Sequence, residues 1–302
     1  MKFPLLLLTL LSLTFSSAQG IKYLIIKGSF VVIGKQPDGD SVRFRPDQPA
    51  LLKKLKRGYR IDLSKDGTVQ LRFEAIDAPE LHYLGKEQPL SREPRDFLLA
   101  QLGFSDYIYN HNDTITDSVP KEIRGGILSQ AAETNGRPVS YVFLENDLSN
   151  FTDGERTSID DTLLAKSINS KVLQAGMAYY TVYSSQPENH RVFMHALAQQ
   201  AKAANLGIWA LDRTSEFALS SFEDVTTAQL ILPKLFRRCI GYLRERDKGF
   251  TGTLQDWLLV NPSSDDEILL GTRKTRLSSV IQVEGNTIKV LFDPLKAVFI
   301  EK

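Results

Sequence analysis

Residues 71–80 read Leu-Arg-Phe-Glu-Ala-Ile-Asp-Ala-Pro-Glu. The apolar, β-prone part of this run predicts a strand with an arginine, Arg72, at its start. Proline does not continue a strand, so Pro79 predicts a break at the point where Asp77 and Glu80 are presented. We expect the rest of the chain to be organised around this guanidinium and these two carboxylates.

Two other segments place charged side chains near the starts of predicted strands. Residues 38–42, Asp-Gly-Asp-Ser-Val, form an acidic turn that enters a β-prone run. Residues 135–137, Asn-Gly-Arg, precede the strand-like residues 139–143. Each acidic segment alone is more often a plain turn than a site. The prediction of a site therefore rests on the order and spacing of all three segments.

Oxygen ligands and arginines in this order indicate a metal and a phosphate. Asp40 and Asp77, brought together by separate strands, would repel each other unless a cation lay between them. Such hard ligands suit Ca²⁺ or Mg²⁺, whereas one cysteine and four scattered histidines support a zinc site poorly. Glu80 could hold a water for attack on phosphorus. Arg72 and Arg137 could stabilise the charge that develops on the phosphate oxygens.

The composition is that of an ordinary globular protein with no strong charge bias. The chain has 302 residues, which favours one domain plus a sizeable appendage. Lys and Arg number 37 and Asp and Glu 36, a formal net charge of +1. Nucleic-acid binders are usually more positive than that. The balance does not exclude one, because a few well-placed arginines matter more at a site than the total.

The first residues are typical of a secretion signal. Lys2 gives a positive start, residues 5–15 an apolar core, and Ser16-Ser17-Ala18 a small-residue cleavage site. The apolar core is shorter than the roughly 20 residues of a membrane span. We therefore predict a signal peptide over residues 1–18 and a secreted or periplasmic protein without a stable membrane span, with an uncleaved anchor as the alternative. The lone Cys239 cannot form an internal disulfide.

Apolar periodicity predicts three helices after the first strands, over residues 91–102, 159–174 and 188–205, the second ending at Gly176. Residues 212–225 are predicted to be a linker. Residues 226–302 are predicted to be a small accessory α+β domain of unknown function. It would contain one helix between Leu232 and Leu243 and then β-structure over residues 254–260, 267–270, 278–283 and 287–292.

Taken in order, these segments resemble the staphylococcal nuclease (thermonuclease) family. Its Asp-Gly-Asp-Thr-Val resembles residues 38–42, and its Arg-x-x-x-x-Asp-x-Pro-Glu resembles residues 72–80. Its Gly-Arg before a strand resembles Gly136-Arg137. Later segments of the family resemble residues 174–178 and the Leu-Gly-Ile-Trp of residues 206–209. The resemblance covers residues 30–209.

The resemblance implies an α+β fold over residues 21–211, a five-stranded OB-fold β-barrel with three helices packed against it. It implies that Asp40, Asp77 and the main-chain carbonyl of Ala78 bind Ca²⁺, and that Glu80 is the general base. It implies that Arg72 and Arg137 bind the scissile phosphate. The implied activity is that of a secreted, calcium-dependent endonuclease, a hydrolase that cleaves DNA and RNA to 3′-phosphate products. OB barrels offer an open face for single strands.

The sequence also departs from the family pattern. Thr134 and Asn135 stand before Gly-Arg where the best-known member has lysine and tyrosine, and Pro138 follows the arginine. These changes, the insertions at residues 46–60 and 103–133 and the near-zero charge favour a rival reading. That rival is a nucleic-acid or protein binding module with weak turnover. A third reading is a cell-surface structural protein. We favour the nuclease, because all five acid and arginine positions are filled.

Overall fold

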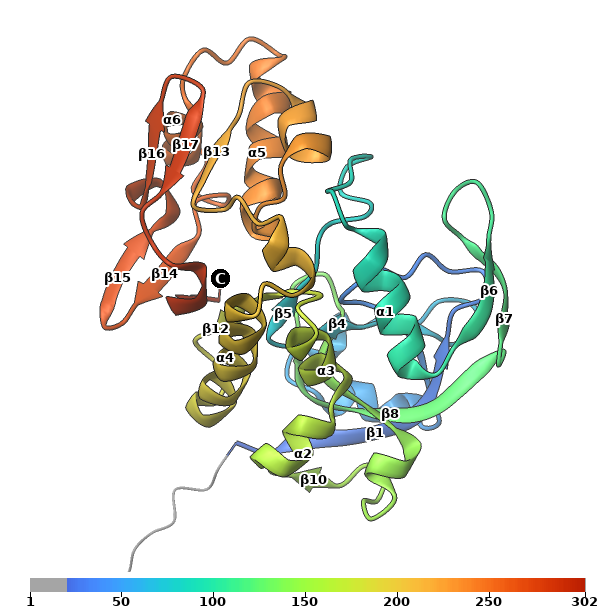
Figure 1. Cartoon of the computed structure of the whole chain (residues 1–302). Helices are drawn as coiled ribbons and strands as arrows, with labels where there is room; N and C mark the ends of the chain where they lie inside the picture. The colour runs from blue at the N-terminus through green and yellow to red at the C-terminus, as the bar shows by residue number, and fades with distance from the viewer. Residues whose placement is uncertain (1–20, 302) are drawn as a thin grey trace, which may run out of the picture.

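The computed structural model describes residues 21–301. The predicted signal peptide, residues 1–18, lies outside this range. Figure 1 shows a barrel with helices around it, built from the first two thirds of the chain, and a smaller α/β layer from the last third above it. Within residues 21–301, no helix combines the length and apolar character needed to cross a membrane.

One sheet forms the barrel, with strand order β3-β2-β1-β8-β9-β4 and with β10 added beside β1. The two ends of this order, β3 and β4, belong to the single stretch 69–73 and are separated only by Leu71. The stretch therefore bonds to β2 on one side and to β9 on the other, which nearly closes the sheet on itself. The strands are β1 Tyr23–Val31, β2 Arg43–Pro46, β3 Val69–Gln70, β4 Arg72–Phe73, β8 Glu122–Ala132, β9 Pro138–Leu144 and β10 Arg156–Thr157.

This mixed α+β barrel agrees with the predicted OB-type architecture, but the strand count differs. The sheet has seven strands where five were predicted. The break at Leu71 divides one predicted strand, and the two-residue β10 adds another. A separate hairpin fills part of the long segment 103–133, with strands β6 Ser105–Tyr109 and β7 Ile115–Val119.

Four helices cover the barrel: α1 Arg92–Leu102, α2 Asp161–Lys166, α3 Ile168–Gln174 and α4 Glu188–Ala203. The prediction of one continuous helix over residues 159–174 was wrong, because the segment forms two helices, α2 and α3. Ser167 leaves the helical conformation and its side chain accepts a hydrogen bond from the Ser170 N–H, so it caps a second helix. Gly176 follows α3 with a φ of 68°, the left-handed conformation predicted for a C-terminal cap.

The C-terminal third forms two small sheets and two helices. Its elements are β13 Glu216–Ala218, α5 Pro233–Arg246, α6 Leu254–Val260, β14 Glu267–Leu270, β15 Arg273–Arg276, β16 Ile281–Glu284, β17 Thr287–Val290 and β18 Ala297–Phe299. The prediction of β-structure over residues 254–260 was wrong. Thr253 and Asp256 make a capping box, and Leu254, Trp257 and Leu258 are buried at helical spacing.

The C-terminal third is built onto the barrel. Strand β12 (Val182–Tyr183), which follows the strand β11 (Tyr179–Tyr180) of a separate two-stranded sheet, pairs in parallel with β18. Strand β13 lies inside the predicted linker, residues 212–225, and pairs with β17. The Tyr179 hydroxyl donates to Asp212 at 2.8 Å. A continuous apolar core joins the two parts and includes Phe217, Leu219 and Val225. Residues 212–225 therefore pack against the rest of the protein in this structure.

Candidate active site

A tight turn between β4 and β5 (Ile76–Asp77) sets the spacing of Arg72 and Asp77. Ala75 adopts a φ of 70° in this turn. Asn169 of α3 holds the turn against β9: its side-chain amide donates to the Glu74 carbonyl at 2.9 Å and to the Ser140 carbonyl at 3.0 Å. Because Asn169 is fully buried, these bonds fix the backbone that carries the charged side chains.

The acidic turn at residues 38–40 lies directly against the same stretch. The Phe73 N–H donates to the Asp40 carbonyl at 3.0 Å. A Cβ on Gly39 would lie 2.5 Å from the Ala78 Cβ, so only glycine allows the two segments to approach this closely. Asp40 and Ala78 are 7% and 5% exposed. The turn therefore places Asp40 beside Asp77 and Ala78.

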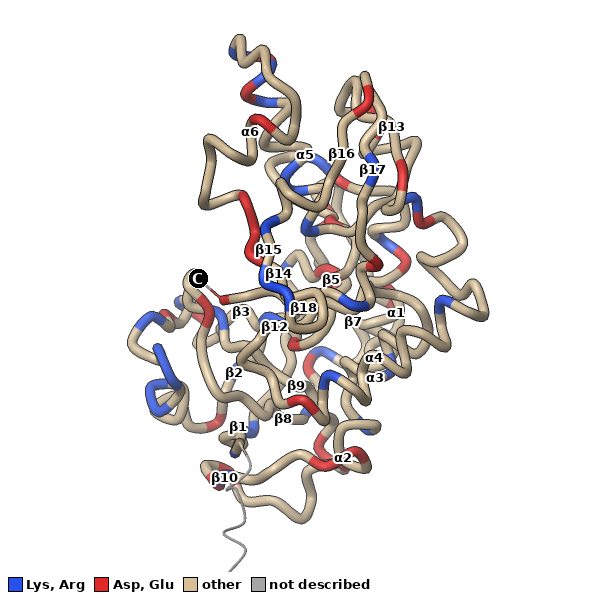
Figure 2. Tube along the Cα trace, turned by 90° about the vertical axis from the view of Figure 1, so that its left-hand side faces the viewer, with Lys and Arg blue, Asp and Glu red and all other residues tan. Residues whose placement is uncertain are grey.

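The charged side chains meet around Arg72. Its Nη1 lies 3.7 Å from Asp40 Oδ2 and its Nη2 lies 3.3 Å from Asp77 Oδ1. A second arginine, Arg237 of α5, donates from Nη2 to Asp77 Oδ2 at 2.8 Å and from Nη1 to Asp77 Oδ1 at 3.3 Å. Arg237 Nη1 also donates to Glu80 Oε1. The structure thus brings together Asp40, Arg72, Asp77 and Glu80 and adds a partner from the C-terminal third. Figure 2 shows basic residues along α5 and acidic residues at β5.

Arg137 is the one predicted side chain that the structure holds elsewhere. Within residues 21–301, its hydrogen bonds and ion pair are to Glu133, with Nε 3.0 Å from Oε1, and not to Asp40, Asp77 or Glu80. Its positive charge still lowers the pKa of Asp40, so it lies within electrostatic range of the site. The non-family residues Thr134 and Asn135 belong to the same turn: Arg60 donates to the Thr134 carbonyl, and the Asn135 N–H donates to Glu133.

Burial sets the protonation of these carboxyls, and the arginines modify it. Burial raises the pKa of Asp40 to about 8; the Asp38 charge adds to the rise and Arg72 opposes it. Burial would also raise the pKa of Asp77, but the charges of Arg237 and Arg72 outweigh it and bring that pKa to about 2. Burial raises the pKa of Glu80 despite its contact with Arg237. A carboxylate with a raised pKa is a favourable general base.

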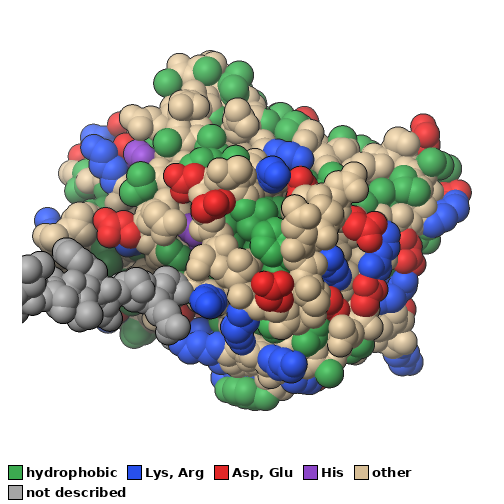
Figure 3. Space-filling view, turned by 90° about the horizontal axis from the view of Figure 1, so that it is seen from below, with side chains coloured by type: hydrophobic (Ala, Val, Ile, Leu, Met, Phe, Trp, Pro, Cys, Tyr) green, Lys and Arg blue, Asp and Glu red, His purple; other side chains and the backbone are tan. Residues whose placement is uncertain are grey.

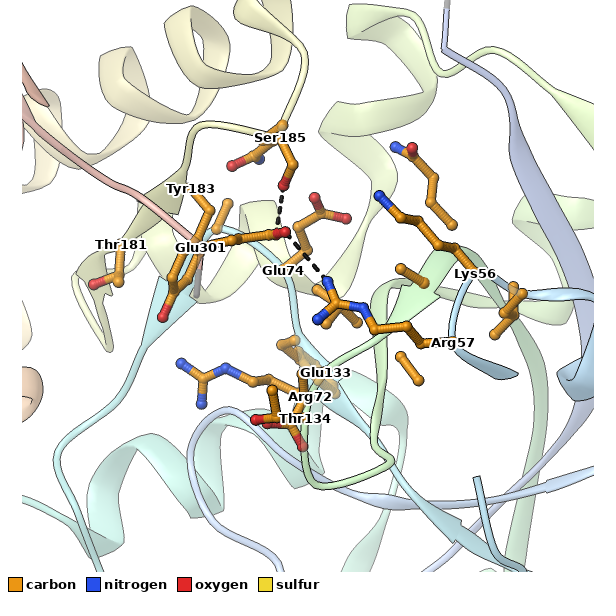
Figure 4. Close-up of a pocket in the computed structure, with 18 of the residues that line it drawn as sticks. Lys56, Arg57, Arg72, Glu74, Glu133, Thr134, Thr181, Tyr183, Ser185 and Glu301 are labelled. Carbon is orange, nitrogen blue, oxygen red and sulfur yellow. Dashed lines mark hydrogen bonds and ion pairs between the residues drawn. The ribbon is translucent and has the colours of Figure 1, made fainter. Parts of the chain in front are cut away.

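A cavity of about 630 Å³ adjoins Arg72, between the barrel and the C-terminal third. Tyr183, Lys234 and Glu301 line it together with Arg72 and Glu74, as the close-up in Figure 4 shows in part. Its basic lining residues, which outnumber the acidic ones, are Lys22, Lys54, Lys56, Arg57, Arg72, Arg156 and Lys234. Glu301 bonds to Arg57 at 3.3 Å and accepts from the Ser185 hydroxyl at 2.5 Å, which closes one side of the cavity.

The donors of the implied calcium site are hard oxygens, which suit Ca²⁺. Within residues 21–301, no group of three acidic, histidine or cysteine side chains is arranged to hold a metal ion. The donors that the resemblance implies are the Asp40 and Asp77 carboxylates and the Ala78 carbonyl. Both oxygens of Asp77 already accept bonds from guanidinium groups. The donor atoms are of the kind that calcium prefers. In this structure the positive charge beside Asp77 comes from Arg237 and Arg72.

Sequence reasoning missed Arg237. Helix α5 was predicted from its apolar residues, and no motif distinguishes Arg237 from the neighbouring Arg238. Asp77 and Arg237 are 160 residues apart in sequence. Only the docking of α5 on the barrel brings them together, so a sequence signal for the contact was not available.

Residues 70–211 match the family model described as staphylococcal nuclease homologue. No curated protein matches the chain. The matched range contains Arg72, Asp77, Ala78, Glu80 and Arg137, whereas Asp40 and Arg237 lie outside it. The match confirms, over residues 70–211, that this chain carries a domain of the staphylococcal nuclease family.

Proposed function

We propose that this site hydrolyses the phosphodiester bonds of DNA and RNA, with Ca²⁺ as the cofactor and 3′-phosphate ends as products. The observation that carries the proposal is the position of Arg72, with its guanidinium nitrogens 3.7 Å from Asp40 and 3.3 Å from Asp77. Phosphoryl transfer uses a guanidinium that binds phosphate through two hydrogen bonds, next to oxygen ligands that hold a metal ion. The family match supports the same proposal, since the matched family model is that of a nuclease homologue.

Each residue has a role that its surroundings support. Asp40, Asp77 and the Ala78 carbonyl would hold Ca²⁺, which when bound would polarise the phosphoryl oxygens. Glu80, with its pKa raised by burial, would take the proton of the attacking water. Arg72 would bind the scissile phosphate, with Arg137 as a second arginine once it leaves Glu133.

The cavity beside Arg72 is where we place the nucleic acid. It is large enough for a nucleotide, at about 630 Å³, and its basic residues could neutralise phosphates. The Tyr183 ring in its wall could stack on an unpaired base, which favours single strands. Figure 3 shows Lys and Arg side chains gathered on the lower face of the molecule with acidic side chains among them. Local basic charge thus coexists with a net charge of +1.

We further propose that the protein is exported by its N-terminal segment and acts as a secreted or periplasmic enzyme. N-terminal sequencing of the protein recovered outside the cytoplasm tests this: a mature chain that begins after Ala18 is expected. An intact N-terminus would contradict cleavage.

The function is tested with 5′-labelled single-stranded DNA and RNA oligonucleotides, incubated with Ca²⁺ or with chelator. We expect calcium-dependent shortening. The DNA products should resist extension by a polymerase until a phosphatase removes the 3′-phosphate. Products that extend at once would contradict the predicted ends. Binding of the oligonucleotide without cleavage would instead indicate a binding module.

A further inference from the structure

Arg237 comes from outside the matched nuclease domain, yet it contacts both carboxylates to which the chemistry is assigned. Its two terminal nitrogens bond to the two oxygens of Asp77 at 2.8 and 3.3 Å, and Nη1 also bonds to Glu80. The side chains of Arg237 and Asp77 are 17% and 1% exposed. This is a paired, largely desolvated contact, in which charge–charge attraction is strong.

A guanidinium in this position excludes a metal ion from the same oxygens. The Asp77 oxygens that would face Ca²⁺ are the ones that accept from Arg237, and two cations cannot share that position without strong repulsion. The same side chain also engages Glu80, the carboxylate that would hold the attacking water. Arg237 thus bonds to the proposed calcium ligand, Asp77, and to the proposed general base, Glu80, at the same time.

We propose that Arg237 is a built-in competitor of Ca²⁺, so that the ion loads only when the Arg237 side chain leaves Asp77. This inference rests on the proposed function and deepens it by naming the regulation of the site. Departure of Arg237 frees Asp77 Oδ2 for a hard cation, leaves Oδ1 with Arg72 alone, and frees Glu80 for water in the same movement. The C-terminal third therefore controls when the nuclease domain is loaded.

The displacement is a rotation of the side chain rather than a separation of the two parts of the molecule. Helix α5 is seated through the fully buried Phe236, whose ring packs against that of Tyr83. The Gln88 side chain donates to the Ile231 carbonyl at 2.7 Å, just before α5. Strand pairing of β12 with β18 adds a second attachment. Separating the C-terminal third from the barrel would break all of these contacts, whereas rotating Arg237 breaks only its ion pairs.

The neighbouring arginine provides a matched control. Arg238 follows Arg237 on the same helix and is equally buried, with 18% of its side chain exposed. It forms a bidentate ion pair with Asp266 of the C-terminal third, at 2.8 to 3.0 Å. Its loss removes one buried ion pair from α5 without changing the partners of Asp77 or Glu80.

The test is a calcium titration by isothermal calorimetry on the full chain, without nucleic acid. Wild-type protein, Arg237→Gln and Arg238→Gln are compared. We expect Arg237→Gln to bind one Ca²⁺ at least tenfold more tightly than the wild type. We expect Arg238→Gln to bind as the wild type does. Thermal unfolding in chelator and in Ca²⁺ gives a second readout, in which the calcium-induced rise in Tm should be largest for Arg237→Gln.

Equal calcium affinity of Arg237→Gln and wild type, or no calcium binding by Arg237→Gln, would overturn the proposal. If Arg237→Gln does not fold, Arg237→Lys replaces it. A single ammonium cannot bond to both Asp77 oxygens as the fork does, so tighter calcium binding than wild type is again expected, and an unchanged affinity overturns the proposal. Because no substrate is present, failure here is separate from failure of the nuclease proposal, which the oligonucleotide assay decides.

Discussion

Arg72 of the barrel and Arg237 of the C-terminal third bond to the same carboxylate, that of Asp77, but they are held in different ways. Arg72 stands on β4, which pairs with β9, so it is in place whenever the barrel is folded. Arg237 stands on a helix from another part of the chain and bonds to the oxygens that calcium would use. We therefore propose different roles for the two charges: Arg72 binds the phosphate, and Arg237 keeps Ca²⁺ away from Asp77.

The largest effect is expected from the carboxylate that Arg237 covers. Glu80→Gln removes the proposed base and should lower hydrolysis by roughly 10³-fold, within the range for general bases. Rates of nucleotide release under single-turnover conditions measure this. Glu87→Gln, at a half-buried glutamate paired with Arg92, is the control and should cleave as the wild type does. A Glu80→Gln rate near that of the wild type would remove Glu80 from the mechanism.

The two arginines should respond to the same substitution in opposite directions. Arg72→Gln removes a phosphate ligand and should lower hydrolysis by about 10²-fold. Arg237→Gln should raise hydrolysis at limiting Ca²⁺, because Asp77 and Glu80 are released. Initial rates over a series of calcium concentrations give both results. If both substitutions lower the rate by similar factors, Arg237 belongs to the catalytic machinery and the distinction between the two arginines is lost.

Asn169 holds the turn that follows Arg72 against the barrel. Asn169→Ala leaves the carbonyls of Glu74 and Ser140 and the N–H of Val142 without their buried partner. We expect a loss of roughly 2–4 kcal/mol in the free energy of unfolding. Urea unfolding measures it, with the exposed Asn150→Ala as control, expected within about 0.5 kcal/mol of the wild type. A loss no larger than that of the control would show that the turn is held by other contacts.

The smallest effect concerns Glu74, a negatively charged residue of the barrel that interacts with the negative charge of Glu301 in the C-terminal third. Burial, with the charge of Glu301, raises the pKa of Glu74 from 4.5 to about 8. Between these pH values the folded state keeps a proton that the unfolded state has lost, so this contribution to stability falls as the pH rises from about 4.5 to 8. Glu74 is partly exposed to the cavity, which limits the size of the effect.

Glu74→Gln keeps the neutral form at every pH. Its free energy of unfolding should match that of the wild type at pH 5 and exceed it by about 1–2 kcal/mol above pH 8. Urea unfolding at the two pH values tests this. A constant difference between the two proteins would mean that Glu74 does not titrate in this range.

Much of the barrel site could be predicted because its signals are local. Pro79 ends the strand after Asp77, Gly39 allows the acidic turn to approach Ala78, and Gly176 caps α3. Each depends on one residue and its immediate backbone. The same local reasoning failed for Ser167, where a serine that can cap a helix was read as part of its interior.

The contacts that decide the state of the site are not local. Arg137 pairs with Glu133 instead of the carboxylates because the turn before β9 brings the two side chains together. Arg237 reaches Asp77 only because α5 packs on the barrel. Both arginines are ordinary in sequence, and only the tertiary arrangement determines their partners.

We claim that the acidic site cleaves nucleic acid with Ca²⁺ and that Arg237 limits access of the ion. The most direct measurement is release of acid-soluble nucleotides from denatured DNA by the wild type and by Arg237→Gln, as a function of Ca²⁺ and with chelator. We predict calcium-dependent release by both proteins, with half-maximal release at a lower Ca²⁺ concentration for Arg237→Gln. No release by either folded protein at any Ca²⁺ concentration would contradict the claim.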